Sequence, residues 1–396
     1  MPVRFLTPED RMAYERIQSI AFVNSMDEKE RKARIDKDPG WPVKCIGHFA
    51  EDGTLTACMA LPEYAVYFDG RPVKMVGVGG VASLPEHRHG GAVRALFQAA
   101  LRDMVADGAV FSALYPFSHA FYRQFGYELS ALAMQYELPT EALKPFRCEA
   151  QARMLTAGDS ADAVKAVYAA YSPRHNLATQ RTDAHWTSAL PADPLKERVY
   201  PYLLSDESGP SAYLVIAAEG AFPDTICARV RELAFARPKG LRDALGFLYR
   251  LAAQYEKMRI ALPSDVPLPA LLAANYDIEP MVRERPMARV INAAEALALA
   301  RYEEETAFTL RVHDDGVPEN DAAFSVIRQN GRTTVERLPQ GCPADCEMDV
   351  RTLAPLLLGF LSFEEACYKP DLIVRANAES LHRAFGKKSV YLTEYF

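Results

Sequence analysis

The sequence predicts a mixed α/β protein of two or three domains, in which helices cover mixed β-sheets. One observation is size, because 396 residues with 49% hydrophobic content exceed one ordinary domain. Another is order, because β-rich stretches alternate with amphipathic helical stretches along the chain. A third is a pair of breaks near residues 140–160 and 280–285, where prolines coincide with a change of pattern. These breaks place the domains at residues 1–145, 146–284 and 285–396.

The elements of the first domain follow from capping residues, alternation and periodicity. Thr7 and Pro8 suit a helix start, and a helical pattern covers residues 7–37. A second helix is expected at residues 91–108, where apolar residues recur with a helical period. We expect the first sheet to finish at Leu138. Strands are expected at residues 44–51, 54–64, 73–84 and 110–114, and a short helix at 119–125.

The second segment repeats the general order of the first without its glycine-bearing loop, and the last segment has a different order. In the second, helices are expected at residues 160–171 and 241–255, and strands at 200–204, 212–219, 227–236 and 257–262. In the last, a helix is expected at residues 292–302, strands at 306–313, 322–329 and 333–338, and helices near Val350 and Ala378.

The composition favours a soluble enzyme or binding protein over several other classes. A net charge of −7 and a pI near 5.7 argue against a nucleic-acid partner, which a basic face would bind. The acidic balance is compatible with a cationic substrate such as an amine. No apolar run reaches signal-peptide or membrane-spanning length. We therefore expect a cytoplasmic protein without a membrane partner.

The cysteines are scattered and give no metal-binding pattern. There are seven, an odd number, and the one close pair is Cys342 and Cys346. No second pair and no histidine cluster accompanies them, so we expect reduced thiols and no metal.

The strongest chemical signal is the loop at residues 88–94, which reads Arg-His-Gly-Gly-Ala-Val-Arg. It follows a strand stopped by Pro85 and opens a helix. Free N–H groups and the dipole at a helix N-terminus bind anions such as a pyrophosphate, and glycines let the backbone come close. Arg88, His89 and Arg94 add positive charge. The alternative is an ordinary strand–turn–helix corner with basic surface residues, and the loop alone does not decide between the two.

The position of the loop in the chain excludes two other folds that bind phosphates with a glycine loop. An antiparallel-type sheet precedes it, whereas a dinucleotide-binding fold places its glycine loop after the first strand. The loop also lacks the lysine of a phosphate-binding NTPase loop. The arrangement resembles the GNAT (Gcn5-related N-acetyltransferase) superfamily, whose acetyl-CoA loop reads Gln/Arg-x-x-Gly-x-Gly/Ala. Arg88 and Gly91 match that pattern, and Val93 departs from it at the last position.

A second signal is the aromatic run at residues 121–127, Phe-Tyr-Arg-Gln-Phe-Gly-Tyr. It is similar to the superfamily phrase FYxxxGF beside the thiol end of the cofactor. The resemblance implies that Tyr122 gives a proton to the departing CoA thiolate. For Phe121, Phe125 and Tyr127 we favour plain core packing.

The whole chain resembles the Eis (enhanced intracellular survival) acetyltransferases, most specifically in residues 83–96 and 121–127. The resemblance implies an α+β, mixed α/β fold: tandem GNAT folds, the first with the cofactor site and the second degenerate, then a sterol-carrier-protein-like domain. It implies a homohexamer that transfers acetyl groups from acetyl-CoA to primary amines, either aminoglycoside-like molecules or lysine and peptide amines.

The resemblance also assigns roles to residues. Tyr122 would be the general acid, and the terminal carboxylate of Phe396 the general base. Phe117 and Ser118 fall where the family has further cofactor contacts, although the family's usual residues there differ. The remaining expected cofactor contacts are the strand backbone at Val81, Ala82 and Ser83 and the loop residues Arg88, His89, Gly90, Gly91, Ala92, Val93 and Arg94.

A terminal carboxylate is a weak base unless its surroundings help. Its ordinary pKa is about 3.3 to 3.7, so it needs burial or an intervening water. The aromatic end of the chain, residues 391–396, is able to supply that burial. The alternative is a frayed tail.

A non-catalytic acyl-CoA- or lipid-binding protein is the second hypothesis for the whole chain. The sterol-carrier-like domain suggests it. Tyr122 paired with an intact basic glycine loop favours the enzyme, because a pure binding protein needs no acid beside the thioester.

Overall fold

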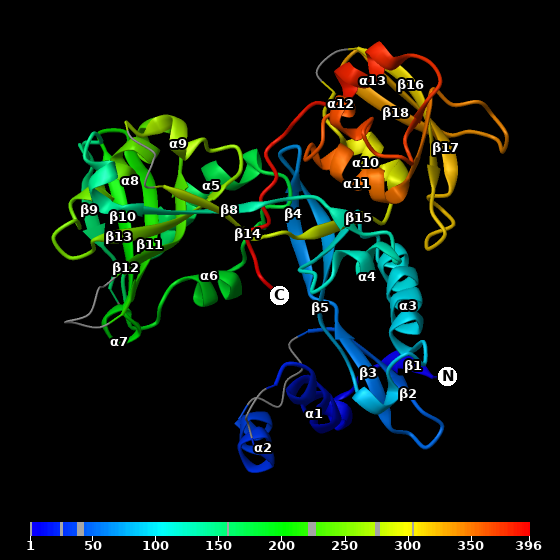
Figure 1. The fold of residues 1–396 in the computed structure, drawn as a ribbon, viewed down its shortest axis with the longest axis horizontal. Coiled ribbons are helices and arrows are strands. Elements are labelled where there is room, and N and C mark those ends of the chain that lie inside the picture. The colour runs from blue at the N-terminus through cyan, green and yellow to red at the C-terminus, as the bar shows by residue number, and fades with distance from the viewer. Residues whose placement is uncertain are drawn as a thin grey trace.

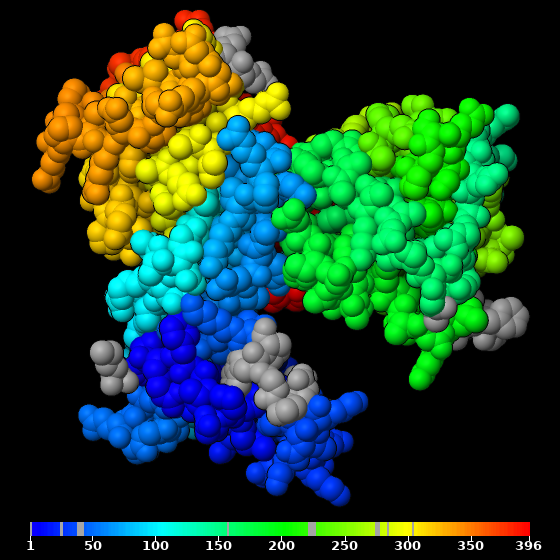
Figure 2. All heavy atoms as spheres, turned by 180° about the vertical axis from the view of Figure 1, so that it is seen from behind, coloured from blue at the N-terminus to red at the C-terminus, as the bar shows by residue number. Residues whose placement is uncertain are grey.

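The structure is a computed structural model that describes residues 2–23, 27–37, 43–156, 158–220, 227–273, 278–302 and 305–396. Within these ranges the strands form three sheets, each with its own helices (Figure 1). The C-terminal tail, residues 389–396, leaves the third domain and runs between the first and second (Figure 1). From the reverse side the first domain contacts the other two, which flank it (Figure 2).

The first sheet is mostly antiparallel, with one parallel pair between β5 and β6. Its order is β1-β2-β3-β5-β6-β15-β7, and β4 pairs with β5. The strands are β1 (Val3–Phe5), β2 (Cys45–Phe49), β3 (Leu55–Ala60), β4 (Glu63–Phe68), β5 (Arg71–Ser83), β6 (Phe111–Leu114), β7 (Glu128–Leu129) and β15 (Met287–Val290). The helices are η1 (Pro8–Asp10), α1 (Arg11–Ala21), α2 (Glu28–Lys37), η2 (Pro85–His87), α3 (Ala92–Ala106) and α4 (His119–Arg123).

Local sequence explains several of these elements. Thr7 and Asp10 form a capping box at the start of η1. The helical pattern at residues 7–37 gives two helices, because α1 ends at Ala21 and α2 begins at Glu28. Helix α3 buries the apolar face that its period predicts. The buried side chains of that face include Leu96, Phe97, Ala100, Leu101 and Met104.

The first sheet does not finish at Leu138. Strand β8 (Ala133–Pro139) instead pairs with β13 and β14 in the second sheet. The chain later returns, and β15 lies between β6 and β7 of the first sheet. The chain therefore crosses between the two sheets twice. The first sheet is interrupted in the sequence, whereas the strands of the second, β8 to β14, follow one another without interruption. Alternation predicts that a strand exists, but nothing in a strand's own pattern states which sheet it joins.

The second sheet has the order β14-β8-β13-β12-β11-β10-β9, and β12 and β13 form its parallel pair. Pro238 lies at the first turn of α8, which suits a helix start. The further strands are β9 (Gln151–Met154), β10 (Val199–Asp206), β11 (Gly209–Glu219), β12 (Cys227–Phe235), β13 (Lys257–Pro263) and β14 (Glu279–Glu284). The helices are η3 (Thr140–Leu143), α5 (Asp162–Tyr171), η4 (Ser172–Arg174), α6 (Asp183–Ala189), α7 (Pro194–Glu197), α8 (Pro238–Tyr249) and α9 (Leu268–Leu271).

The third domain packs closely on the first. One hydrophobic cluster contains side chains of both, such as Phe68 and Phe111 with Leu353 and Leu357. Its sheet has the order β18-β17-β16-β19-β20. Its strands are β16 (Thr306–His313), β17 (Ala322–Gln329), β18 (Arg332–Arg337), β19 (Cys346–Asp349) and β20 (Ile373–Val374), and its helices are α10 (Ala293–Leu299), α11 (Val350–Leu358), α12 (Phe363–Ala366) and α13 (Ala378–Ala384).

Candidate active site

The parallel strands β5 and β6 separate in the middle of β5, and we call this point the first strand split. Their pairing runs from Met75 with Phe111 to Val78 with Leu114. Beyond it, residues 79–83 of β5 continue to pair with β3 on the other edge. The edge that faced β6 is therefore left without a strand neighbour among the described residues. Backbone groups along that edge are available to a ligand.

The loop after β5 presents the start of α3 to the same region. Gly91 is the N-cap residue, and its φ of +81° is a left-handed conformation that favours glycine. Helix α3 begins at Ala92, so the first N–H groups of the helix have no partner within it. The loop and helix start form the anion-binding geometry that the sequence pattern predicts.

A cavity of about 980 Å³ lies between the loop and α4. Ten of the twelve residues expected to contact the cofactor line it. Gly90 and Ser118 are not among the described residues that line it. The Ser118 hydroxyl instead accepts a hydrogen bond from the Phe121 N–H at 3.3 Å and so caps α4. The ten are Val81, Ala82, Ser83, Arg88, His89, Gly91, Ala92, Val93, Arg94 and Phe117.

Sequence reasoning missed six further residues of this cavity. His87 precedes the loop, and its imidazole adds to the basic side chains there. The aromatic run at residues 121–127 contained the signal for three others, which we assigned to core packing or left unassigned. The six are Ala21, Phe22, His87, Phe121, Gln124 and Phe125. Ala21 and Phe22, at the end of α1, have no local signal because the tertiary fold alone brings α1 to the loop.

Tyr122 lies on α4 among aromatic rings. It is 4% exposed, and the ring of the exposed Phe117 lies 5.4 Å away between centroids. Within the described ranges no group hydrogen-bonds its hydroxyl, whereas the nearby Tyr127 hydroxyl lies 2.7 Å from the Ser112 hydroxyl. Burial, and to a lesser extent the neighbouring Tyr127, raise the pKa of Tyr122 well above its usual value. The hydroxyl therefore keeps its proton at neutral pH.

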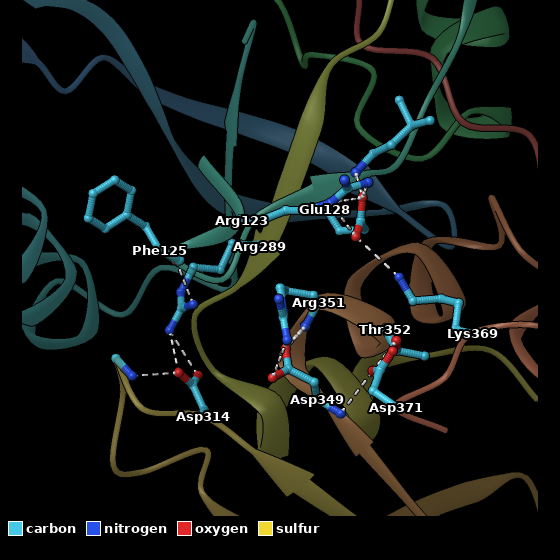
Figure 3. A network of polar contacts seen from close by, with 12 residues as sticks. Arg123, Phe125, Glu128, Arg289, Asp314, Asp349, Arg351, Thr352, Lys369 and Asp371 are labelled. Atoms are coloured by element: carbon cyan, nitrogen blue, oxygen red, sulfur yellow. Dashed lines mark hydrogen bonds and ion pairs between the residues drawn. The ribbon is translucent and has the colours of Figure 1, made fainter. Parts of the chain in front are cut away.

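Contacts with the third domain support the segment that carries Tyr122 (Figure 3). Arg289 on β15 is 1% exposed and donates to the Phe125 carbonyl at 2.7 Å. It also donates to both carboxylate oxygens of Asp314, at 2.6 and 2.9 Å. Glu128 binds Arg123 and, across the domain boundary, Lys369 at 3.1 Å. These bonds hold both ends of the turn after α4 to the third domain.

The C-terminal residue Phe396 lies against β5 at the first strand split. A Cβ on Gly79 would lie 3.0 Å from the Phe396 carboxyl carbon, and a Cβ on Gly77 would lie 2.6 Å from its ring. Both positions therefore require the small size of glycine for this approach. The ring also contacts Tyr64 and Tyr115, with centroids 5.1 and 5.7 Å away.

The tail that ends in Phe396 is docked along its length and is not frayed. The Tyr115 hydroxyl donates to the Glu394 carbonyl at 2.9 Å, and its ring packs on Tyr395. Asn176 and Val390 form an isolated parallel bridge. The structure thus brings residues 77–83, the basic loop, α4 and the C-terminal residue to one region.

Comparisons with known protein families agree with this geometry. The acetyltransferase (GNAT) domain matches residues 2–130, and a second acetyltransferase (GNAT) domain matches residues 177–290. The sterol carrier protein domain matches residues 293–393. The chain belongs to the GNAT acyltransferases. GNAT domains transfer acyl groups from an acyl-CoA, so the enzyme has small-molecule substrates.

Solved structures share the complete three-domain fold. A GCN5-related N-acetyltransferase from Anabaena variabilis matches with a TM-score of 0.85 at 20% identity, over 100% of both chains. One from Kribbella flavida matches with a TM-score of 0.79 at 20% identity, over 100% of this chain and 98% of the other. Eis1 from Mycobacterium abscessus matches with a TM-score of 0.79 at 19% identity, over 100% of both. At this identity the likeness establishes the fold. No curated protein sequence matches the chain.

The second GNAT domain of this acyltransferase differs at the place of the basic loop. Helix α8 follows β12 through Ala236 and Arg237 only, without a glycine turn. A Cβ on Gly240 would lie 2.3 Å from the Ser211 carbonyl oxygen, so α8 packs tightly on the neighbouring backbone. The Arg174 guanidinium donates to the carbonyls of Phe235 and Ala236, at 2.6 and 3.1 Å. The degenerate second domain thus has a filled corner where the first has an open loop.

Two features are absent from the described part of this GNAT acyltransferase. No group of three or more His, Cys, Asp or Glu side chains there is arranged to hold a metal ion. No helix in the same ranges is long and apolar enough to cross a membrane.

Proposed function

We propose that this enzyme is an acetyl-CoA-dependent N-acetyltransferase that acts on primary amines, either aminoglycoside-like or those of lysine and peptides. The observation that carries the proposal is the position of Phe396, whose carboxyl carbon lies beside Gly79 where β5 and β6 separate. In this proposal that carboxyl group, the protonated Tyr122 beside the cavity-lining Phe117 and Phe121, and the anion-binding loop would serve one reaction.

The charges of the large cavity support acetyl-CoA as the acyl donor. None of the described residues that line it is acidic, and His87, Arg88, His89 and Arg94 gather at the loop. These side chains and the free N–H groups of α3 would hold the pyrophosphate. The β5 backbone at Val81, Ala82 and Ser83 would hold the acetyl-pantetheine arm beside Phe117. Gly90 and Ser118 would contribute only through their backbone or after a local movement, because neither lines the cavity.

A smaller cavity of about 430 Å³ supports an amine acceptor. Glu63, Tyr64 and His185 are among its lining residues. The Tyr64 ring stacks on His185 with centroids 5.5 Å apart and contacts the Phe396 ring. The aromatic faces suit a cationic acceptor. Glu63 is paired with Lys74 at 2.9 Å, and Lys44 also lines the cavity. The cavity would therefore deliver the acceptor to the Phe396 side of the first strand split.

The reaction we propose is direct transfer. The neutral amine nitrogen attacks the thioester carbonyl carbon, and the Phe396 carboxylate takes the proton that the nitrogen loses. Unpaired N–H groups of β5 beyond the split stabilise the negative carbonyl oxygen. The carbon–sulfur bond breaks with its electron pair on sulfur, and the Tyr122 hydroxyl gives its proton to that sulfur. Solvent then reprotonates Tyr122 and deprotonates Phe396.

Two variants test these roles. Tyr122→Phe is expected to lower kcat by about 100-fold or more while acetyl-CoA still binds, because only the proton donor is lost. Deletion of Phe396 moves the terminal carboxylate back by one residue and is expected to lower kcat similarly. Steady-state kinetics with calorimetric CoA binding measures both effects. Tyr127→Phe is the matched control and should keep kcat, because its hydroxyl serves Ser112. Unchanged kcat in either test variant would overturn that residue's role.

A thiol-release assay with acetyl-CoA and a panel of amines tests the activity itself. The GNAT assignment favours the enzyme over a non-catalytic acyl-CoA- or lipid-binding protein, and release of CoA only when an amine is present is the expected result. We expect a homohexamer on the basis of the resemblance to the Eis family, and a cytoplasmic location on the basis of the sequence pattern alone. Sedimentation velocity measures the assembly, and fluorescent tagging at the N-terminus measures the location.

A further inference from the structure

Arg181 is a buried cation that joins the second domain to the C-terminal tail. It lies between η4 and α6, and its side chain is 3% exposed. Its terminal nitrogens donate to both carboxylate oxygens of Glu232 on β12, at 2.8 and 3.1 Å. Its Nε donates to the Glu394 carboxylate at 2.6 Å. One guanidinium thus links two carboxylates that are far apart in sequence.

We propose that Arg181 is the positioning residue that holds the Phe396 carboxylate at the first strand split, an inference that rests on the proposed role of that carboxylate as base. The second GNAT domain would then act in catalysis through the tail and not through a cofactor of its own.

The surroundings of Arg181 leave it one orientation. Its guanidinium lies over the rings of Tyr168 and Trp186, 4.4 and 4.8 Å from their centroids. The Tyr213 hydroxyl hydrogen-bonds Glu232 and so orients the carboxylate that Arg181 binds. Burial by itself lowers the pKa of Arg181, but the surrounding negative groups, Glu232 foremost, raise it above its usual value. The cation is therefore permanent, and a planar bidentate contact fixes its direction.

The neighbouring residues of the tail are bound to the same region of the second domain. The Thr393 hydroxyl accepts a hydrogen bond from the Thr179 N–H at 3.0 Å and lies 3.1 Å from the Tyr168 hydroxyl. The Tyr391 N–H donates to the Asn176 carbonyl at 2.9 Å. Glu394 is the last residue that the second domain binds, and Phe396 is two residues further. Two extended residues span about 7 Å at most, so a shift at Glu394 passes directly to the carboxylate.

The position of Glu232 in the second sheet completes the argument. The parallel pairing of β12 with β13 ends at Val230 and Ile260, which we call the second strand split. Glu232 lies two residues beyond that point on β12. In the first domain the terminal carboxyl group lies over Gly79 of β5, and here Arg181 binds the side chain of Glu232 on β12. A carboxylate at this position has no role in binding an acyl-CoA, but it is the group that an arginine requires.

Arg181→Met tests the proposal. We expect kcat to fall by about 10- to 100-fold with the KM for acetyl-CoA unchanged, because a displacement near 1 Å at a catalytic group has an effect of this size. Arg259→Met is the matched control. Arg259 also links two glutamates of the second sheet, Glu137 at 2.7 Å and Glu219 at 2.9 Å, but among the described residues it has no hydrogen bond or ion pair with the tail. The Arg259→Met variant should keep the kcat of the parent enzyme.

A double-mutant cycle separates positioning from general damage. In protein that already lacks Phe396, Arg181→Met should cause no further loss of kcat, because the group that it positions has gone. Independent, multiplicative losses would overturn the proposal. Full kcat in Arg181→Met alone would also overturn it while leaving the base role intact. Full kcat after Phe396 deletion would instead overturn the base role.

Removal of a buried arginine leaves Glu232 without its partner and endangers folding. Glu394→Ala avoids this, because the Arg181–Glu232 pair remains. This variant should melt near the parent temperature, bind CoA equally well, and show the same selective loss of kcat. Normal kcat in a folded Glu394→Ala protein would contradict the proposal.

Discussion

The two GNAT domains have the same parallel strand pair and use it differently. In the first, β5 and β6 pair over four residues each, from Met75 and Phe111 to Val78 and Leu114. In the second, β12 and β13 also pair over four residues each, ending at Val230 and Ile260. Beyond its split the first domain has an open edge, a basic loop and a large cavity.

Beyond its own split the second domain has Glu232, bound to a buried arginine. This difference indicates that the second domain, which lacks the glycine loop, still has a role in this protein. Arg181 and Tyr168 bind the tail at Glu394 and Thr393, and the guanidinium of Arg181 lies over the rings of Tyr168 and Trp186. Each of the following predictions changes one side of this comparison and leaves the other unchanged.

Removal of the loop cations should have the largest effect. In Arg88→Gln with Arg94→Gln, we expect the KM and Kd for acetyl-CoA to rise by about 100-fold, because two charge-assisted contacts to phosphate are lost. Arg237→Gln with Lys239→Gln makes the same change at the start of α8. These residues pair with Asp206 and with the buried Asp243, so a loss of stability without a change in CoA binding is expected there. Calorimetry measures both, and equal weakening in the two double variants would contradict the assignment of the site to the first domain.

We expect the free energy of unfolding to depend on pH through His175 of the second domain. His175 lies 2.5 Å from the Ser389 hydroxyl at the start of the tail. Burial lowers its pKa to about 4 from 6.5, against the attraction of Asp265. The unfolded chain therefore binds a proton between pH 6.5 and 4 that the folded protein does not. Its stabilising effect is complete above pH 6.5 and falls as the pH falls toward 4.

Between pH 7 and 5 this difference amounts to about 2 kcal/mol. Urea unfolding of the parent and of His175→Gln at both pH values measures it. The variant should lose that much less stability on acidification. An identical loss in both proteins would show that His175 is not the source.

A methyl group at the first strand split should have the smallest of these effects. Gly79→Ala places a Cβ 3.0 Å from the Phe396 carboxyl carbon, which must move by a few tenths of an ångström. We expect kcat to fall about tenfold with CoA binding unchanged. Gly386→Ala is the control, because its Cβ would meet nothing within 4 Å. Steady-state kinetics at saturating acetyl-CoA compares the two, and equal rates would mean that Phe396 tolerates displacement.

Local chemistry is what the sequence by itself determined. A helix start with free N–H groups, Gly91 in a left-handed conformation and arginines nearby all depend on residues within a few positions of each other. The loop was therefore predictable, and ten of the twelve expected contacts line one cavity. The aromatic run around Tyr122 was visible for the same reason. Periodicity likewise predicted helices such as α3 and α11.

Long-range placement was decided only by the tertiary structure. No local pattern puts β8 in the second sheet or β15 in the first, because alternation specifies a buried face and not a neighbour. No local pattern marks Gly77 and Gly79 as the positions on which Phe396 packs. No local pattern marks Arg181 either, because its burial and charge pairing depend on groups from distant parts of the chain. Glu394 is such a group, 213 positions from Arg181 in the sequence and in direct contact with it in the fold.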